Sequence, residues 1–224
     1  MKKILFSIAL LSIFAIDATW AAGPDTKKEW KPLFTESLSN ATYDKEAWTY
    51  EDGVLTASKD NAIWTNLIYE NFILELEFMN DEGTNSGVVV YCTDRDNWIP
   101  NSVEIQIADD YSEENINQHP RFKCGAIYGH LGPNKENVVK KAGEWNKMKI
   151  ICKGQRITVT LNGKKVTDMD MSEWTSGTTN PDGTEIPSWL PKPFAELPTA
   201  GYIGLQGKHG NAKISFRKMK IREL

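Results

Sequence analysis

Apolar and polar residues alternate along most of the chain with a period of two, which is the pattern of half-buried β-strands. The clearest run is FILELEFMN at 72–80, where one face is Phe, Leu, Leu and Phe and the other includes Glu75 and Glu77. The other predicted strands lie within 48–58, 85–94, 102–108, 124–129, 144–154, 155–170, 201–207 and 214–224. Beyond the N-terminus only short helical turns are expected, near 44–48 and 113–118, because no run of ten or more residues follows the helical period.

Turn signals separate the predicted strands about every ten residues. Asp52-Gly53 and Asn162-Gly163 are the residue pairs that favour tight hairpins, because both positions of such a turn need a positive φ. Strands do not alternate with helices, so a parallel sheet is not expected. The pattern predicts an all-β chain folded as an antiparallel sandwich or barrel.

The N-terminus has the features of a secretory signal peptide. Two lysines precede an apolar run from Ile4 to Ile16, and small residues follow near Ala21. We expect cleavage to remove residues 1–21 and to leave a single domain at 22–224, secreted or periplasmic. There is no cysteine near the expected cut, so the sequence gives no signal for a lipid anchor. We find no other segment in the expected mature chain that is apolar enough to span a membrane.

Composition narrows the class of partner. The net charge is −4 and basic residues form no cluster in the sequence, which argues against nucleic acid and against an anionic membrane. Eight Trp and seven Tyr suit carbohydrate, although a β-sandwich also uses aromatic residues in its core. Cys92, Cys124 and Cys152 each lie in a strand-like run without metal-site spacing, so we interpret them as small core residues.

A segment rich in Pro, Gly and Thr, residues 175–201, is too long to be a simple connection. Long loops in compact domains are usually functional or mobile. Trp174, Trp189 and Phe194 in or beside this segment either cover a cleft or fix the loop to the core, and the sequence leaves both readings open.

The segment NSVEIQIADD, residues 101–110, contains the strongest candidate site. Val103 and its alternating neighbours are apolar, whereas Glu104 and Gln106 share the other face, about 7 Å apart. A carboxylate can transfer a proton or bind a metal, and a carboxamide can hold a hydroxyl or carbonyl without competing for that proton. Asp109 returns to this face if the strand ends in a bulge. The alternative is an ordinary strand face that meets water.

Further candidates lie at the ends of other predicted strands or in glycine-rich turns, and each is also compatible with an ordinary surface position. They are Gln206 and His209 in LQGKHGN, Tyr128 and His130 in YGHLGPN, Asn85, Arg95 and Trp98 near strand ends, and Lys149 on the polar side of its own strand.

Six motifs, taken in this order, resemble the 3-keto-disaccharide hydrolase domain family: NSGVVV, VEIQIAD, GAIYG, AGEWNKMKI, VTLNGKKV and GYIGLQGKHGNAKISFRKMKI. The resemblance extends from WKPLF at 30–34 to Leu224. It implies a concanavalin A-like jelly-roll sandwich of two antiparallel sheets, in secreted bacterial proteins that cleave 3-keto-glycosides or other glycosides. Its motif positions are Glu104, Gln106, Asp109, Gln206 and His209, and it extends more loosely to Asn85, Arg95, Tyr128 and Lys149. Lys208 departs from the family pattern as an extra residue before His209.

Laminarinase-type glucanases share this sandwich and carry the motif Glu-x-Asp-x-x-Glu. Here the same spacing reads Glu104, Gln106 and Asp109, so the central carboxylate is an amide and the last one is shorter. Because retaining cleavage needs two carboxyl groups about 5–5.5 Å apart, we expect different chemistry.

A ketone at C3 of a sugar acidifies the proton at C2, so that a base can start elimination at C1. Our hypothesis gives catalytic roles to Glu104, His209 and Asp109, and substrate-binding roles to Gln106, Gln206, Asn85, Arg95, Trp98, Tyr128 and Lys149. A divalent metal cation, with Glu104 and His209 as ligands, is a further possibility. The predicted partner is an oligosaccharide or 3-keto-glycoside. The alternatives are a non-catalytic, lectin-like carbohydrate-binding module and an ordinary glucanase.

Overall fold

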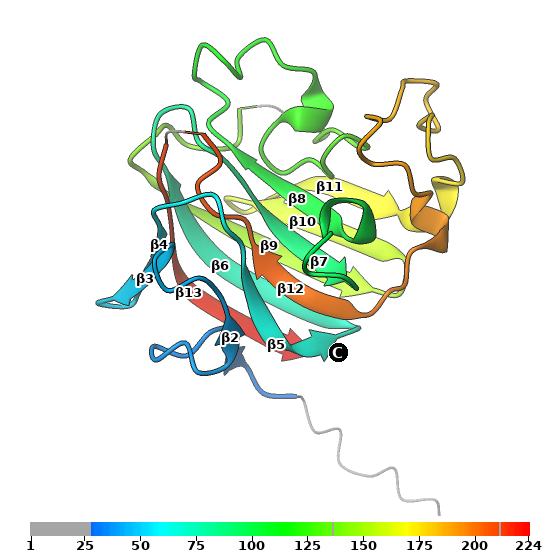
Figure 1. Ribbon diagram of the computed structural model, residues 1–224. Coiled ribbons are helices and arrows are strands. Elements are labelled where there is room, and N and C mark those ends of the chain that lie inside the picture. The colour runs from blue at the N-terminus through cyan, green and yellow to red at the C-terminus, as the bar shows by residue number, and fades with distance from the viewer. Residues whose placement is uncertain (1–27, 136, 211) are drawn as a thin grey trace, which may run out of the picture.

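The computed structural model describes residues 28–135, 137–210 and 212–224, and in them two antiparallel β-sheets pack face to face (Figure 1). The expected signal peptide, residues 1–21, and its cleavage site lie outside the described residues. The predicted all-β sandwich of two antiparallel sheets is confirmed. Among the residues described, no helix is long and apolar enough to span a membrane.

The larger sheet has eight strands in the order β11-β10-β9-β6-β13-β4-β3, with β1 paired to β13. These strands are β1 (Lys31–Pro32), β3 (Trp48–Glu51), β4 (Val54–Ala57), β6 (Phe72–Asn80), β9 (Trp145–Lys153), β10 (Arg156–Leu161), β11 (Lys164–Asp170) and β13 (Ile214–Glu223). The smaller sheet has five strands in the order β2-β5-β12-β7-β8. They are β2 (Ala41–Thr42), β5 (Ile63–Tyr69), β7 (Asn85–Cys92), β8 (Val103–Ala108) and β12 (Gly201–Leu205).

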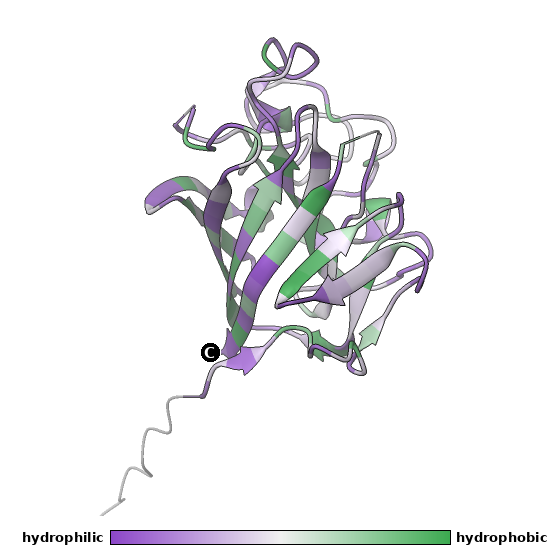
Figure 2. Cartoon of the chain, turned by 90° about the vertical axis from the view of Figure 1, so that its left-hand side faces the viewer, coloured by the Kyte–Doolittle hydropathy of each residue, from purple (hydrophilic) through white to green (hydrophobic). Residues whose placement is uncertain are grey.

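The core lies between the two sheets. Leu74 and Phe78 of β6 face Val88 of β7 and Ile105 of β8 across it, and all four side chains are fully buried. The alternation of hydrophobic and hydrophilic residues along the strands is visible in Figure 2. The three cysteines are free and buried, which agrees with their interpretation as small core residues.

The predicted strands and turns agree with the structure in most of the chain. β6 spans the predicted run, and both hairpin turns have positive φ at their two central residues, Asp52-Gly53 and Asn162-Gly163. The prediction was wrong at 124–129, which forms only isolated bridges, whereas short hydrogen-bonded turns form within 44–48 and 113–118 as expected. It also missed β5, whose alternation is broken by extra residues opposite β12.

A bulge in β13 explains how one buried carboxylate is satisfied. The register shifts between Arg217 and Lys220, and Lys218 has a φ of +51°. The extra residue places Arg217 and Lys218 on the same face, where they reach Glu77 at 2.7 and 3.2 Å. Burial raises the pKa of Glu77, but these two partners outweigh it, so that the pKa is lowered overall.

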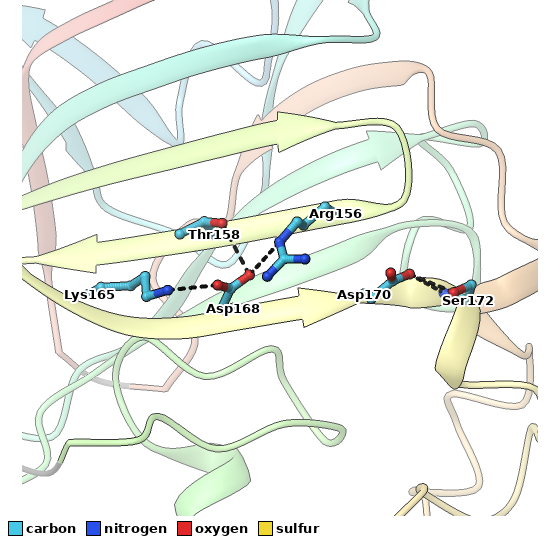
Figure 3. Close-up of polar contacts among 6 residues, drawn as sticks. All are labelled: Arg156, Thr158, Lys165, Asp168, Asp170 and Ser172. Atoms are coloured by element: carbon cyan, nitrogen blue, oxygen red, sulfur yellow. Dashed lines mark hydrogen bonds and ion pairs between the residues drawn. The ribbon is translucent and has the colours of Figure 1, made fainter.

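The β10–β11 hairpin at the edge of the larger sheet is held by Asp168 (Figure 3). Its carboxylate accepts hydrogen bonds from Arg156 at 2.8 Å and Lys165 at 2.7 Å, and these lower its pKa to about 2. Asp170, on the same strand, binds only Ser172 in this view.

We predict that Asp168→Asn lowers the free energy of unfolding at pH 7, because it removes the charge that binds Arg156 and Lys165. The loss should be only about 1 kcal/mol, because both basic partners are exposed to solvent. A lowered pKa stabilises the fold above the ordinary carboxyl pKa, so the loss should shrink as pH falls from about 4 towards 2. Urea unfolding at pH 7 and pH 3 measures it. Asp170→Asn is the matched control and should cost less than half as much; equal losses would contradict the assignment.

Candidate functional site

The candidate site lies on the outer face of the five-stranded sheet. Strand register places Glu104 of β8 beside Val89 of β7, then Gly204 of β12, then Trp64 of β5. One step further along β8, Gln106 lies beside Gly87 of β7. Because residues two apart on a strand share a face, both rows face away from the core.

Two glycines let large side chains lie flat on this sheet. A Cβ at Gly87 would lie 2.1 Å from Oε1 of Glu104, so the carboxyl group is folded over the backbone of β7. A Cβ at Gly204 would lie 2.4 Å from the ring of Trp64, so the indole lies across β12. Neither glycine has a positive φ, and the requirement at both positions is therefore space rather than backbone conformation.

The carboxyl group of Glu104 has unusual electrostatics. Its Oε1 is enclosed and has no hydrogen-bond partner. Burial alone raises the pKa of this carboxyl group from 4.5 to about 8, because no nearby cation stabilises its charge. Glu77 is the contrasting case, since its two basic partners outweigh the effect of burial and lower the pKa of its carboxyl group. At neutral pH, Glu104 is therefore mostly protonated.

Amide side chains surround Gly87. Gln106 is buried and donates from Nε2 to Oδ1 of Asn85 at 3.0 Å, while its own Oε1 is enclosed without a partner. The backbone N–H of Gln206 donates to the carbonyl of Gly87 at 2.9 Å, which places Gln206 on the other side of this glycine from β8. Two unmet acceptor oxygens on neighbouring positions are costly in a folded protein and are typical of functional sites.

His209 lies on the same face but at a distance from Glu104. It bridges to Asn85, which pairs with Ala108, four residues beyond Glu104. That separation is about 13 Å along the strand at about 3.3 Å per residue. The exposed imidazole donates from Nδ1 to Oδ2 of Asp60 at 2.7 Å, which leaves Nε2 for a ligand.

A cleft of about 580 Å³ opens beside Gln206. Trp64 forms part of it, and Trp98 meets this ring edge to face with centroids 6.2 Å apart. Arg95 lies 4.5 Å above the ring of Tyr202 and donates to Thr42, so its position is fixed. The cleft is lined by Thr42, Tyr43, Asp44, Asp60, Asn61, Ala62, Trp64, Arg95, Asp96, Trp98, Ile99, Gln206 and His209.

Tyr128 and the long loop form the surroundings of Glu104 on the side away from this cleft. The backbone N–H of Tyr128 donates to the carbonyl of Glu104 at 2.9 Å. Burial and the charge of Glu104 raise the pKa of Tyr128, while a hydrogen bond with Trp189 lowers it. Trp174 and Phe194 are buried and fix the 175–201 loop, whereas Trp189 is 54% exposed. The loop therefore brings one exposed indole towards the site.

Two expected site residues lie elsewhere. Asp109 does not return to the face of Glu104, because its oxygens accept from the backbone N–H groups of Gly83 and Tyr111 and cap the end of β8. Lys149 belongs to β9 in the other sheet, on the opposite side of the molecule, where its backbone lies opposite that of Glu75 in β6. The prediction that these two residues join Glu104 was wrong. Alternation along a single strand cannot show which sheet, or which end of a strand, a side chain occupies.

The expected metal ligands are not brought together. Glu104 and His209 are separated as described above, and nowhere in the described ranges do three His, Cys, Asp or Glu side chains gather in a possible metal site.

Sequence reasoning missed Trp64 and Asp60, because it did not predict β5 or the turn before it. Glycines inside two strand-like runs, Gly87 in NSGVVV and Gly204 in GYIGL, were the available signal, since a glycine inside a strand often marks a close approach.

Glu104→Gln should stabilise the protein at alkaline pH. A carboxyl group whose pKa rises on folding stabilises the fold fully below pH 4.5, and that contribution is lost as pH rises to about 8. The amide does not titrate. The variant's advantage over the parent should therefore grow by on the order of 1 kcal/mol per pH unit over this range, as measured by urea unfolding at pH 5 and pH 8.

Glu77→Gln is the matched control, because its carboxylate is buried but paired and its pKa is lowered. It should destabilise the protein at both pH values. The account of Glu104 fails if both variants lose stability equally at pH 8.

Solved structures of similar fold include a close relative. A crystal structure of a candidate glycosyl hydrolase from Parabacteroides distasonis is 67% identical to this chain, with a TM-score of 0.86, and the match covers 88% of this chain and 100% of that one. A protein with a galectin-like fold from Bacillus subtilis shows the fold alone, at 14% identity, a TM-score of 0.53 and coverage of 87% and 94%. So does a carbohydrate-binding module from the same species, at 13%, 0.52, and 82% and 96%.

These similarities confirm the predicted jelly-roll fold. A comparison with curated proteins finds no match. The sequence profile of the 3-keto-alpha-glucoside-1,2-lyase-like domain matches residues 28–222, which include all of both sheets except the last residue of β13. The chain therefore belongs to the 3-keto-alpha-glucoside-1,2-lyase-like domain family.

Proposed function

We propose that this protein is a carbohydrate-active enzyme that cleaves the glycosidic bond of a 3-keto-glycoside, with Glu104 as the base that removes the C2 proton. The observation that carries this proposal is the carboxyl group of Glu104, whose Oε1 is enclosed without a partner among the described residues and whose pKa is raised to about 8. Glu104 lies on the outer face of the five-stranded sheet, the face on which Trp64 and Gln206 line the cleft, but it does not line the cleft itself. Family membership and the close relative named as a candidate glycosyl hydrolase support the class of reaction.

The proposed reaction balances without an oxidant or reductant. Glu104 takes the proton from C2, and the C–H electron pair forms the C2=C3 double bond of an enolate whose negative charge lies on the former ketone oxygen. The C1–O bond then breaks, the aglycone leaves and takes up a proton, and a C1=C2 double bond remains. Water adds across this bond, with hydroxyl at C1 and hydrogen at C2, and gives the 3-keto sugar.

The raised pKa of Glu104 suits this base role. A carboxylate that is poorly solvated gains more from accepting a proton than an ordinary one does, and a pKa near the working pH balances base strength against the fraction ionised. Desolvation is the only cause of the shift, so the site supplies a strong base without a neighbouring anion that would repel the developing enolate.

The surrounding groups suit a sugar. Trp98, whose ring is partly exposed and packs edge to face on the buried ring of Trp64, offers an aromatic surface in the cleft on which a pyranose can stack, and Gln206 lines the same cleft. In this proposal the side-chain amides hold the ketone or neighbouring hydroxyls, Gln106 from its position beside Asn85 and Gln206 from the wall of the cleft. Tyr128 and Trp189 provide a second aromatic surface beside Glu104 for the aglycone.

The position of Asp109 disfavours an ordinary retaining glucanase. That mechanism needs a second carboxyl group facing the same bond, and Asp109 is committed to capping the end of β8. A lectin-like module remains the alternative of another class, and turnover of a 3-keto-glycoside distinguishes the two.

We predict that Glu104→Gln lowers kcat for a 3-keto-glucoside by at least about 100-fold, because general bases typically contribute about 10²–10⁴-fold. Glu77→Gln serves as the control and should retain near-parental turnover when folded. In deuterium oxide, the parent enzyme should release product with deuterium at C2, measured against a sample of free 3-keto sugar. Cleavage of unoxidised glucan instead would indicate a glucanase, and binding without turnover would indicate the module.

The dependence of kcat/KM on pH distinguishes a base from a proton donor at Glu104. As a base, Glu104 must be ionised, so kcat/KM should rise about tenfold per pH unit below pH 8 and level off above it. A profile that falls as pH rises through 8 would instead make Glu104 the proton donor.

A further inference from the structure

A cavity of about 780 Å³ lies on the other side of the molecule from Glu104. Its walls come from β1, β6, β9, β10 and β13 and from the turn at Gly163, so it is formed on the outer face of the eight-stranded sheet. We propose that this cavity is a second carbohydrate-binding site, which takes an anionic polysaccharide segment of the polyuronate type.

The cavity is strongly basic although the chain is acidic. Five lysines line it against two glutamates, in a protein whose net charge is −4. The lining lysines are Lys31, Lys147, Lys149, Lys218 and Lys220. Segregation of positive charge into one concave region concentrates anionic ligands there.

Both glutamates in the cavity already have partners. Glu77 is bound by Arg217 and Lys218, and Glu75 is bound by Lys220 at 3.1 Å. Among the described residues, Lys147 and Lys149 form no ion pair, although strand register places them directly opposite Glu77 and Glu75. Each glutamate therefore forms its ion pairs with basic residues of β13. The lysine opposite it on β9 keeps its charge for a ligand.

The edge of the same sheet shows how lysines are neutralised when the fold provides an anion. There Lys165 and Arg156 both close on Asp168 (Figure 3). In the cavity, by contrast, basic side chains outnumber the carboxylates that could neutralise them. The bulge at Lys218 places an extra basic residue on this face, and the ring of Trp30 holds Lys220 at 4.6 Å.

The pattern of charges favours a uronate polymer over other polyanions. Lysines can pair with the carboxylate of each sugar, while Oε1 of Glu75, whose other oxygen is paired with Lys220, can accept from a neighbouring hydroxyl group. Duplex DNA and a phospholipid surface have few such hydroxyl donors next to their charges. The ligand would hold the enzyme on a polysaccharide while the cleft on the opposite face stays open.

The test is titration of the whole protein with polygalacturonate, followed by calorimetry at low and moderate salt. We expect binding that weakens with salt and becomes about tenfold weaker in the double variant Lys147→Ala/Lys149→Ala. The control, Lys140→Ala/Lys141→Ala, removes two other exposed lysines and should bind as the parent does. Trp64→Ala, in the cleft, should also leave polygalacturonate binding unchanged, and neutral dextran should not bind.

Three results would overturn the proposal: unchanged binding in the Lys147/Lys149 variant, loss of binding in Trp64→Ala, or equal and lysine-dependent binding of anionic vesicles or duplex DNA. The first two place the ligand elsewhere, and the third shows an unspecific polyanion surface. Cleavage of a 3-keto-glucoside by the Lys147/Lys149 variant is a separate readout, so this proposal and the proposed function can fail independently.

Discussion

The constraint on which the site depends is the close approach of the Glu104 carboxyl group to the backbone at Gly87. Among the residues that the structure describes, nothing donates to Oε1, and burial is the one cause that raises the pKa of this group. The fold therefore keeps this carboxyl group neutral up to about pH 8 at a cost in stability. The tightly packed core between the two sheets supplies the stability that this arrangement requires.

A second glycine, in the neighbouring strand β12, also makes room for a large side chain. Gly204 removes a side chain where Trp64 must lie flat, just as Gly87 does for Glu104. Because β7 and β12 are adjacent, the two close approaches place a carboxyl group and an indole on one face, with Gln206 between them. The two faces of the molecule then differ in kind: aromatic and polar side chains line the cleft, whereas lysines line most of the cavity on the opposite sheet.

Much of the fold could be predicted from the sequence because it is written in local patterns. The period-two alternation of β6 and the Asn162-Gly163 turn are local properties, and both appear as predicted. β5 could not be predicted in the same way, because extra residues break its alternation and leave Leu67 and Ile68 exposed. Trp64 was missed with it.

The candidate site was predictable only where one strand carries it. Glu104 and Gln106 share a face because of alternation alone, and the structure places them so. Asp109 and Lys149 required knowledge of how a strand ends and which sheet it joins, which are long-range properties. The positive cavity is also invisible in the sequence, since its lysines come from three separate strands.

The most direct test of the account is a measurement of the pKa of Glu104 itself. NMR of the side-chain carboxyl carbon, assigned with Glu104→Gln, should show this group titrating near pH 8 in the folded protein. A pKa near 4.5 would mean that the carboxylate is solvated or paired, and it would contradict the strong, desolvated base on which the proposed reaction rests.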